Sequence, residues 1–147
     1  MSNPTLLKFG YPDSLVAGTP TWSVLVRPQQ VTLGSLVLVC RDPVTAFGQV
    51  SPGAFSGLQP VVQSVEHMLT SFVGYQRINY LMLMMVDPDV HFHVIPRYEG
   101  MREWRGRQFA DASWPGPPDL TKAQALTAEE ISSLVAELKA HWPGAAG

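Results

Sequence analysis

Runs of apolar residues predict extended segments in the first two thirds of the chain. Thr21–Val26 and Gly34–Cys40 are rich in β-branched and apolar residues, which predicts two strands. Leu15–Ala17 predicts a short strand that pairs with the first of them. Ile78–Val86 is apolar on both faces, so we expect it to be central in a sheet. Val90–Tyr98 predicts a fourth strong strand.

A helical period follows Ser51 and Pro52, which supply a capping hydroxyl and a proline at the first helical position. Gly74 suits the end of this helix. Pro60 lies inside it and removes one backbone hydrogen bond, which predicts a kink or a shorter helix. Apolar residues recur at spacings of three and four and define one helix face: Phe55, Leu58, Val62, Val65 and Leu69.

The last third of the chain is less regular. Glu99–Leu126 predicts irregular structure and contains the sequence WPGPP. Thr127 and Glu130 then form a capping box, which predicts the start of a final helix. Strand pairs joined by short links, together with two helices, predict an α+β domain in which helices pack on an antiparallel sheet.

Composition narrows the class of protein. A length of 147 residues suits a single domain, and a hydrophobic content of 46% favours a globular chain. The net charge of −2 argues against a protein that wraps nucleic acid or binds a membrane surface through basic residues. The single Cys40 excludes an internal disulfide and is expected to be buried. The start is not signal-like and no apolar run approaches about 20 residues, so we expect a cytoplasmic protein.

Candidate chemistry is concentrated in the fourth predicted strand. Side chains alternate along a strand, so Asp89, His91 and His93 share one face while the apolar residues between them pack on the core. A half-exposed strand with a polar outer face is one interpretation. A metal site that recruits His67, His141 or an aspartate as a third ligand is another, although neither histidine position is demanded by a metal and we predict none.

The sequence DVHFHVIPR resembles the motif of the histidine triad (HIT) superfamily, in which His-x-His-x-His precedes two apolar residues. The second and third histidines are His91 and His93, and Asp89 stands in place of the first. Gly34–Val39 resembles the glycine-led strand of the family, and Ile78–Asn79 resembles the strand that ends in a phosphate-contacting asparagine. The segments RPQQVTLG and INYLMLMMVDP are similar to a bacterial subgroup described as diadenosine-tetraphosphate-hydrolase-like.

The resemblance implies a HIT-like fold, with an antiparallel sheet of about five strands, one long helix and a C-terminal helical segment. We expect residues 1–110 to form the HIT-like domain. Residues 111–147 are expected to form an extension whose helix packs on the same domain, which gives a single domain overall. The resemblance also implies a homodimer, a small nucleotide substrate and no cofactor.

In chemical terms the resemblance implies a nucleotide hydrolase or transferase that cleaves a phosphoanhydride or phosphoramidate, such as a diadenosine polyphosphate. The nucleophile would be His91, through a covalent nucleotidyl-histidine, because a neutral imidazole is a competent nucleophile near pH 7. His93 would hydrogen-bond a phosphate oxygen. The implied substrate-binding residues are Asn79, Asp89, Arg27, Gln30 and Thr32.

Asp89 is the departure from the motif. Its backbone carbonyl can still orient His91, but a carboxylate on the same face would raise the pKa of that histidine and repel a phosphate. The alternative function is therefore a nucleotide-binding protein with low or no turnover. If the carboxylate instead points away, toward an arginine, this conflict disappears. From the sequence alone, Asp89→His is expected to preserve or raise activity.

Overall fold

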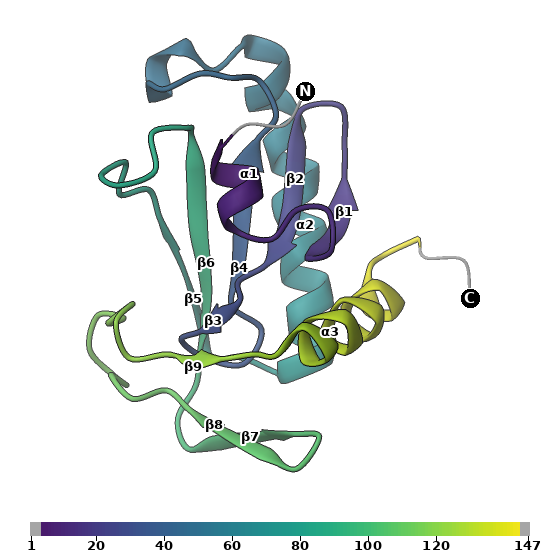
Figure 1. The fold of residues 1–147 in the computed structure, drawn as a ribbon, viewed down its shortest axis with the longest axis vertical. Coiled ribbons are helices and arrows are strands. Elements are labelled where there is room, and N and C mark those ends of the chain that lie inside the picture. The colour runs from purple at the N-terminus through teal and green to yellow at the C-terminus, as the bar shows by residue number, and fades with distance from the viewer. Residues whose placement is uncertain (1–3, 145–147) are drawn as a thin grey trace.

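The computed structural model describes residues 4–144 and is built around a five-stranded antiparallel sheet (Figure 1). Its strands, in spatial order, are β1 (Leu15–Gly18), β2 (Trp22–Val26), β4 (Leu36–Cys40), β6 (His91–Arg97) and β5 (Arg77–Leu81). The remaining elements are α1 (Pro4–Lys8), β3 (Gln29–Gln30), the 3-10 turn η1 (Phe47–Gln49), α2 (Pro52–Val73), β7 (Met101–Trp104), β8 (Arg107–Ala110), β9 (Gln124–Ala125) and α3 (Ala128–His141). The α+β prediction is confirmed.

The two faces of the sheet are covered by different helices. Alternate side chains of β2, β4 and β6 join a large apolar core with α2 and α3. The opposite face holds a smaller cluster, in which Leu25, Val37 and Val39 pack against α1. Figure 1 shows α1 in front of the sheet and α2 behind it. All five residues of β4, including Cys40, are buried because both faces of the sheet are covered.

The predicted ends of α2 are confirmed. The Ser51 hydroxyl accepts a hydrogen bond from the backbone N–H of Ala54, and Gly74 adopts a left-handed conformation (φ 59°) that ends the helix. Pro60 does not shorten the helix, which runs for 22 residues. It is tolerated because it and Ser56, whose carbonyl loses the helical N–H partner, both face solvent.

The buried face of α2 is rotated from the predicted one. Phe55 is 43% exposed, and Leu58 and Val62 are only partly buried. The α-helical period allows this alternative because apolar residues occupy two neighbouring stripes, and the sheet selects between them. The residues that are buried are Ala54, Val61, Val65, Met68, Leu69 and Val73.

The predicted central strand is wrong in both position and length. β5 ends at Leu81 and lies at the edge of the sheet, paired only with β6 within residues 4–144. Residues 82–86 continue as a loop, in which Met85 is 84% exposed and Val86 is 82% exposed. Met84 takes a positive φ of 53°, which is incompatible with a continuing strand. The apolar residues of this loop are therefore not all buried, although their sequence predicted a buried strand.

The predicted irregular segment contains a hairpin and a further short strand. β7 pairs with β8 across the turn Arg105-Gly106, and both turn residues have positive φ. β9 pairs with β3, which attaches the segment to the connector after β2. The capping box at Thr127 is confirmed, and α3 packs on α2, β1 and β2. The predicted boundaries at residues 1 and 147 lie outside the described residues.

Among residues 4–144, no helix combines the length and the hydropathy that crossing a membrane requires.

Candidate active site

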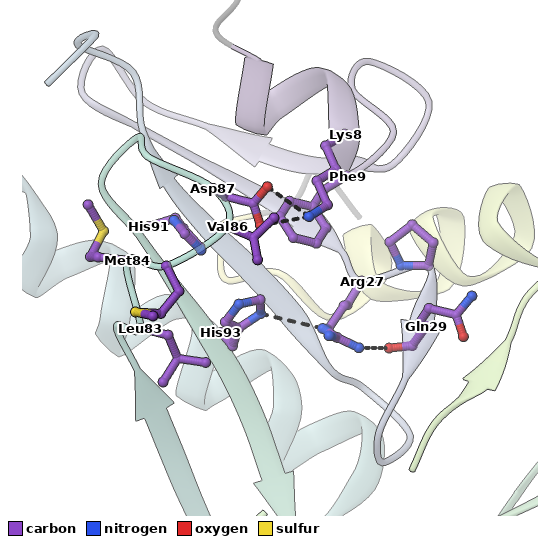
Figure 2. A pocket seen from close by; sticks show the side chains of 12 residues that line it. Lys8, Phe9, Arg27, Gln29, Leu83, Met84, Val86, Asp87, His91 and His93 are labelled. Atoms are coloured by element: carbon purple, nitrogen blue, oxygen red, sulfur yellow. Dashed lines mark hydrogen bonds and ion pairs between the residues drawn. The ribbon is translucent and has the colours of Figure 1, made fainter. Parts of the chain in front are cut away.

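β6 places two histidines side by side on the α1 face of the sheet. His91 lies opposite Val39 and His93 opposite Val37, so both rings project from the same face. The two residues are 2% and 6% exposed, respectively. They line a cavity of about 410 Å³ (Figure 2). The complete lining is Lys8, Phe9, Arg27, Pro28, Gln29, Leu83, Met84, Met85, Val86, Asp87, His91 and His93.

The tautomer of His91 follows from its hydrogen bond. Its Nδ1 lies 2.6 Å from the backbone carbonyl oxygen of Asp89. A carbonyl oxygen only accepts, so Nδ1 carries the proton and donates. In the neutral ring this leaves the lone pair on Nε2. The nitrogen that can attack an electrophile is therefore fixed by a backbone contact.

His93 has the opposite arrangement. Its Nδ1 accepts a long hydrogen bond of 3.4 Å from Nε of Arg27, so the proton of the neutral ring lies on Nε2. Burial, and then the positive charge of Arg27, lower the pKa of His93 to about 4. The ring is thus neutral at pH 7. The two imidazoles lie nearly perpendicular, with centroids 5.1 Å apart, and place a lone pair beside a neutral N–H donor.

Of the three predicted residues in the connector after β2, only Arg27 lines the cavity. Its Nη1 also donates to the carbonyl of Gln29 at 2.6 Å, which directs the guanidinium along the cavity wall (Figure 2). Gln30 is buried, and its amide bonds the backbone of Arg27, Gly34 and Ser35. Thr32 is buried and donates to the carbonyl of Pro96 at 2.6 Å. Gln30 and Thr32 therefore shape the connector that carries Arg27.

Asn79 lies away from the histidines. It faces Ile95 across the β5–β6 pair, and its Oδ1 accepts from Nη1 of Arg97 at 2.8 Å. Together with Trp114, these polar residues line a second, wider cavity of about 810 Å³. The structure therefore does not bring Asn79 into the histidine cavity.

Asp89 does not line the cavity. It is buried and accepts hydrogen bonds from the hydroxyl of Thr5 at 2.8 Å and from the backbone N–H of Thr5 at 3.3 Å. Thr5 belongs to α1, so the partner is a threonine and not the arginine that the sequence suggested. The carboxylate that does line the cavity is Asp87, and it is paired with Lys8 at 2.8 Å.

Comparisons with solved structures define the fold. A histidine triad protein from Bradyrhizobium japonicum superposes with a TM-score of 0.74 at 20% identity, covering 97% of both chains. One from Sinorhizobium meliloti 1021 gives 0.74 at 21% identity, covering 96% of both. A diadenosine triphosphate hydrolase from Plasmodium falciparum gives 0.64 at 9% identity, covering 88% of this chain and 76% of that one. No family model matches the chain, and no curated protein does.

The chain has the histidine triad fold. The coverage of nearly the whole chain includes the C-terminal segment, where motif similarity was loosest.

Within the HIT fold, several cavity residues had no signal in the sequence. Phe9 follows α1 directly and lies against both histidines, with ring centroids 6.2 Å from His91 and 5.7 Å from His93. Lys8 comes from α1 itself, and Leu83 and Asp87 come from the loop after β5. Nothing local in these segments indicates that they meet. The proline that follows Asp87 predicted only a turn.

The histidines considered as metal ligands lie elsewhere in the HIT fold. His141, on α3, has its Nδ1 2.6 Å from the hydroxyl of Ser71 on α2. His67 lies within α2. Among residues 4–144, no group of three or more histidine, cysteine or carboxylate side chains is placed to hold a metal ion.

Proposed function

We propose that this protein is a nucleotide hydrolase or transferase that uses His91 as its nucleophile. The observation that carries the proposal is the hydrogen bond from Nδ1 of His91 to the Asp89 carbonyl, which leaves the Nε2 lone pair beside the neutral His93 in a cavity. A neutral imidazole with a fixed tautomer meets the requirement for an activated nucleophile near pH 7.

In the proposed reaction, Nε2 of His91 attacks the α-phosphorus of a nucleotide. A nitrogen–phosphorus bond forms as the bond to the leaving phosphate or amine breaks. The Asp89 carbonyl keeps the Nδ1 proton and stabilises the positive charge that develops on the ring. Nε2–H of His93 donates to a phosphate oxygen. Water then attacks the phosphorus, which breaks the nitrogen–phosphorus bond, releases a nucleoside monophosphate and restores His91.

The cavity supports a nucleotide as the substrate class. Its volume of about 410 Å³ lies in the range of small-ligand sites. Phe9 and the loop around Leu83 supply apolar and aromatic surface for a base. Arg27 supplies a guanidinium on the same wall as the histidines for phosphate oxygens. The name of the Plasmodium neighbour and the resemblance of the DVHFHVIPR motif favour dinucleoside polyphosphates within this class.

The structure weakens the reason for the alternative function. A binding protein with little turnover was suggested because the Asp89 carboxylate would face the nucleophile and repel phosphate. That carboxylate instead bonds Thr5, and its backbone carbonyl still orients His91. The orientation of the nucleophile thus survives the replacement of the first triad histidine.

The test is to incubate the protein with diadenosine tetraphosphate, diadenosine triphosphate and adenosine phosphoramidate in parallel. We expect release of adenosine monophosphate from at least one of them. Intact mass after rapid quenching should show one adenylyl adduct, stable in base and lost in acid, as expected for a nitrogen–phosphorus bond. His91→Ala should show neither adduct nor turnover.

The matched control is His141→Ala, which removes a histidine bonded to Ser71 on the surface and should retain both signals. Full turnover in His91→Ala would contradict the mechanism. Binding of these nucleotides without adduct or turnover in the wild-type protein would instead support the binding-protein alternative.

We further propose that the protein is cytoplasmic and that it acts as a homodimer, the latter as the HIT resemblance implies. The exposed edge of β5 and the apolar loop after it provide surface on which a second copy can pack. Light scattering coupled to size-exclusion chromatography measures the mass directly. A monomer at micromolar concentration would contradict this part of the proposal.

A further inference from the structure

α1 forms one wall of the histidine cavity although it is only five residues long. Leu6 and Phe9 pack on Leu25, Val37 and Val39 of the sheet. A helix of this length has no independent stability in water. The position of α1 therefore depends on its contacts with the rest of the protein.

Two carboxylates from the segment just before β6 hold α1. Asp89 accepts two hydrogen bonds from Thr5, and Asp87 accepts from Nζ of Lys8 at 2.8 and 2.9 Å. Thr5 and Lys8 are three residues apart, so they lie on one side of the helix. We call these four residues the α1 clasp. Its two halves differ, because the Thr5–Asp89 pair is buried whereas Lys8 is about half-exposed.

The α1 clasp connects the wall of the cavity to the catalytic strand. Asp89 is two residues before His91, and Asp87 lies in the loop that supplies the opposite wall. Figure 2 shows Lys8 and Asp87 meeting above the cavity, with Phe9 beside the histidines. Loss of the clasp would free Phe9 to leave the two imidazoles without changing the backbone contact of His91.

We propose that the side chain of Asp89 is a positioning residue that acts through Thr5 to hold α1 and Phe9 against the substrate. The carboxylate thereby has a role of its own, distinct from that of the histidine it replaces in the motif. The proposal rests on the proposed function only for its kinetic consequences, because the ordering of α1 can be measured without a substrate.

Asp89→His is expected to loosen α1, in contrast to the preserved or raised activity that the sequence motif implies. A neutral imidazole carries no charge and has a single acceptor nitrogen, so it cannot accept from both donors of Thr5 as the carboxylate does. We now expect that variant to raise KM with little change in kcat. An increase in activity would support the earlier expectation and contradict the clasp.

The decisive experiment is amide hydrogen exchange of the full chain carrying Thr5→Val or Asp89→Asn. The reporters are the backbone N–H groups of Phe9 and Tyr11, which bond carbonyls within the α1 region. Thr5→Val removes the hydroxyl donor and Asp89→Asn removes the charge of the acceptor, so exchange of the reporter amides should accelerate about tenfold or more, while β4 and β6 amides stay unchanged. The double variant should show far less than the sum of the two effects, because both disrupt one contact.

Thr5→Ser keeps both donors and should restore wild-type exchange. Thr121→Val is the matched control, since it removes an equivalent threonine–aspartate hydrogen bond, to Asp119, from an exposed loop. With substrate, Thr5→Val should raise KM about tenfold and leave kcat within about twofold, whereas a purely structural defect would lower Tm without changing KM at low temperature.

Unchanged exchange of the reporter amides in both Thr5→Val and Asp89→Asn would overturn the clasp. If wild-type protein shows no turnover, the proposed function fails, but accelerated exchange in these variants would still establish the clasp. The two failures are therefore distinguishable.

Discussion

At each end of β6 an arginine meets polar side chains on the same face of the sheet, but the two arginines differ in how many hydrogen bonds they make within the protein. At one end, Arg27 reaches His93 through a single long hydrogen bond and lies along an open cavity. At the other, Arg97 is 4% exposed, and all three of its nitrogens donate. Its acceptors are both carboxylate oxygens of Asp111, Asn79 and the carbonyl of Gly116.

The difference separates a site from a structural junction. The Arg97 guanidinium uses four of its five N–H donors within the protein and fastens β6 to the segment after β8. The histidine end retains a lone pair on His91, a proton on His93 and a guanidinium beside a cavity. Residue type alone does not distinguish them. The hydrogen-bonding capacity that remains at each end does, and substitutions at the two ends test that distinction.

The largest effect is expected from His91→Asn. Asparagine can still donate to the Asp89 carbonyl in place of Nδ1, but it offers no nucleophilic nitrogen. We expect kcat/KM for the best dinucleoside polyphosphate to fall about 10³-fold or more, with a small change in unfolding free energy. Steady-state kinetics and urea unfolding measure both. A large loss of unfolding free energy with retained kcat/KM would show that His91 has a structural role and is not the nucleophile.

Arg97→Ala should show the reverse behaviour. It leaves the Asp111 carboxylate buried without its bidentate partner, so we expect a loss of about 3–5 kcal/mol in unfolding free energy. Urea unfolding gives the value. Arg107→Ala, which removes a more exposed ion pair with Glu130, is the matched control and should have a far smaller effect. Wild-type stability in Arg97→Ala would contradict the structural assignment.

The low pKa of His93, about 4, predicts a pH-dependent stability. The unfolded ring binds a proton below about pH 6.5, whereas the folded ring stays neutral until about pH 4. Its contribution is therefore fully present above pH 6.5 and is lost as the pH falls toward 4, up to about 3 kcal/mol. Urea unfolding of His93→Gln over this range should lack that part of the slope. Equal slopes in both proteins would contradict a buried neutral His93.

Arg27→Gln is expected to have the smallest effect. It removes a guanidinium from the cavity wall, so kcat/KM should fall about tenfold, while unfolding free energy changes by less than about 1 kcal/mol. Loss of the positive charge also raises the pKa of His93, so the acid limb of the pH–rate profile should move to higher pH. An unmoved limb would show that Arg27 does not act on His93.

The sequence correctly predicted those features that depend only on residues close together in the chain. Alternation along β6 placed His91 and His93 on one face, and the caps at Ser51, Gly74 and Thr127 marked helix ends. These predictions succeeded because a strand period or a cap involves residues a few positions apart.

Features that depend on distant pairing were missed. The apolar run Ile78–Val86 does not reveal that β5 is an edge strand, because that depends on whether another strand pairs with β5 on the side away from β6. The hairpin at β7 and β8 was missed although it is local, because the prolines later in the same segment, within WPGPP, indicated irregular structure.

The sequence by itself determined the α+β class and the histidine pair, because both follow from the chemistry and spacing of neighbouring residues. Only the tertiary structure decided where the carboxylate of Asp89 points. Its partner, Thr5, is 84 residues away, and no pattern along the chain links the two. The same packing brings Phe9 to the histidines and buries Arg97 with Asp111. Whether each charged group is bonded within the protein or can contact a ligand is therefore decided by the tertiary packing around it.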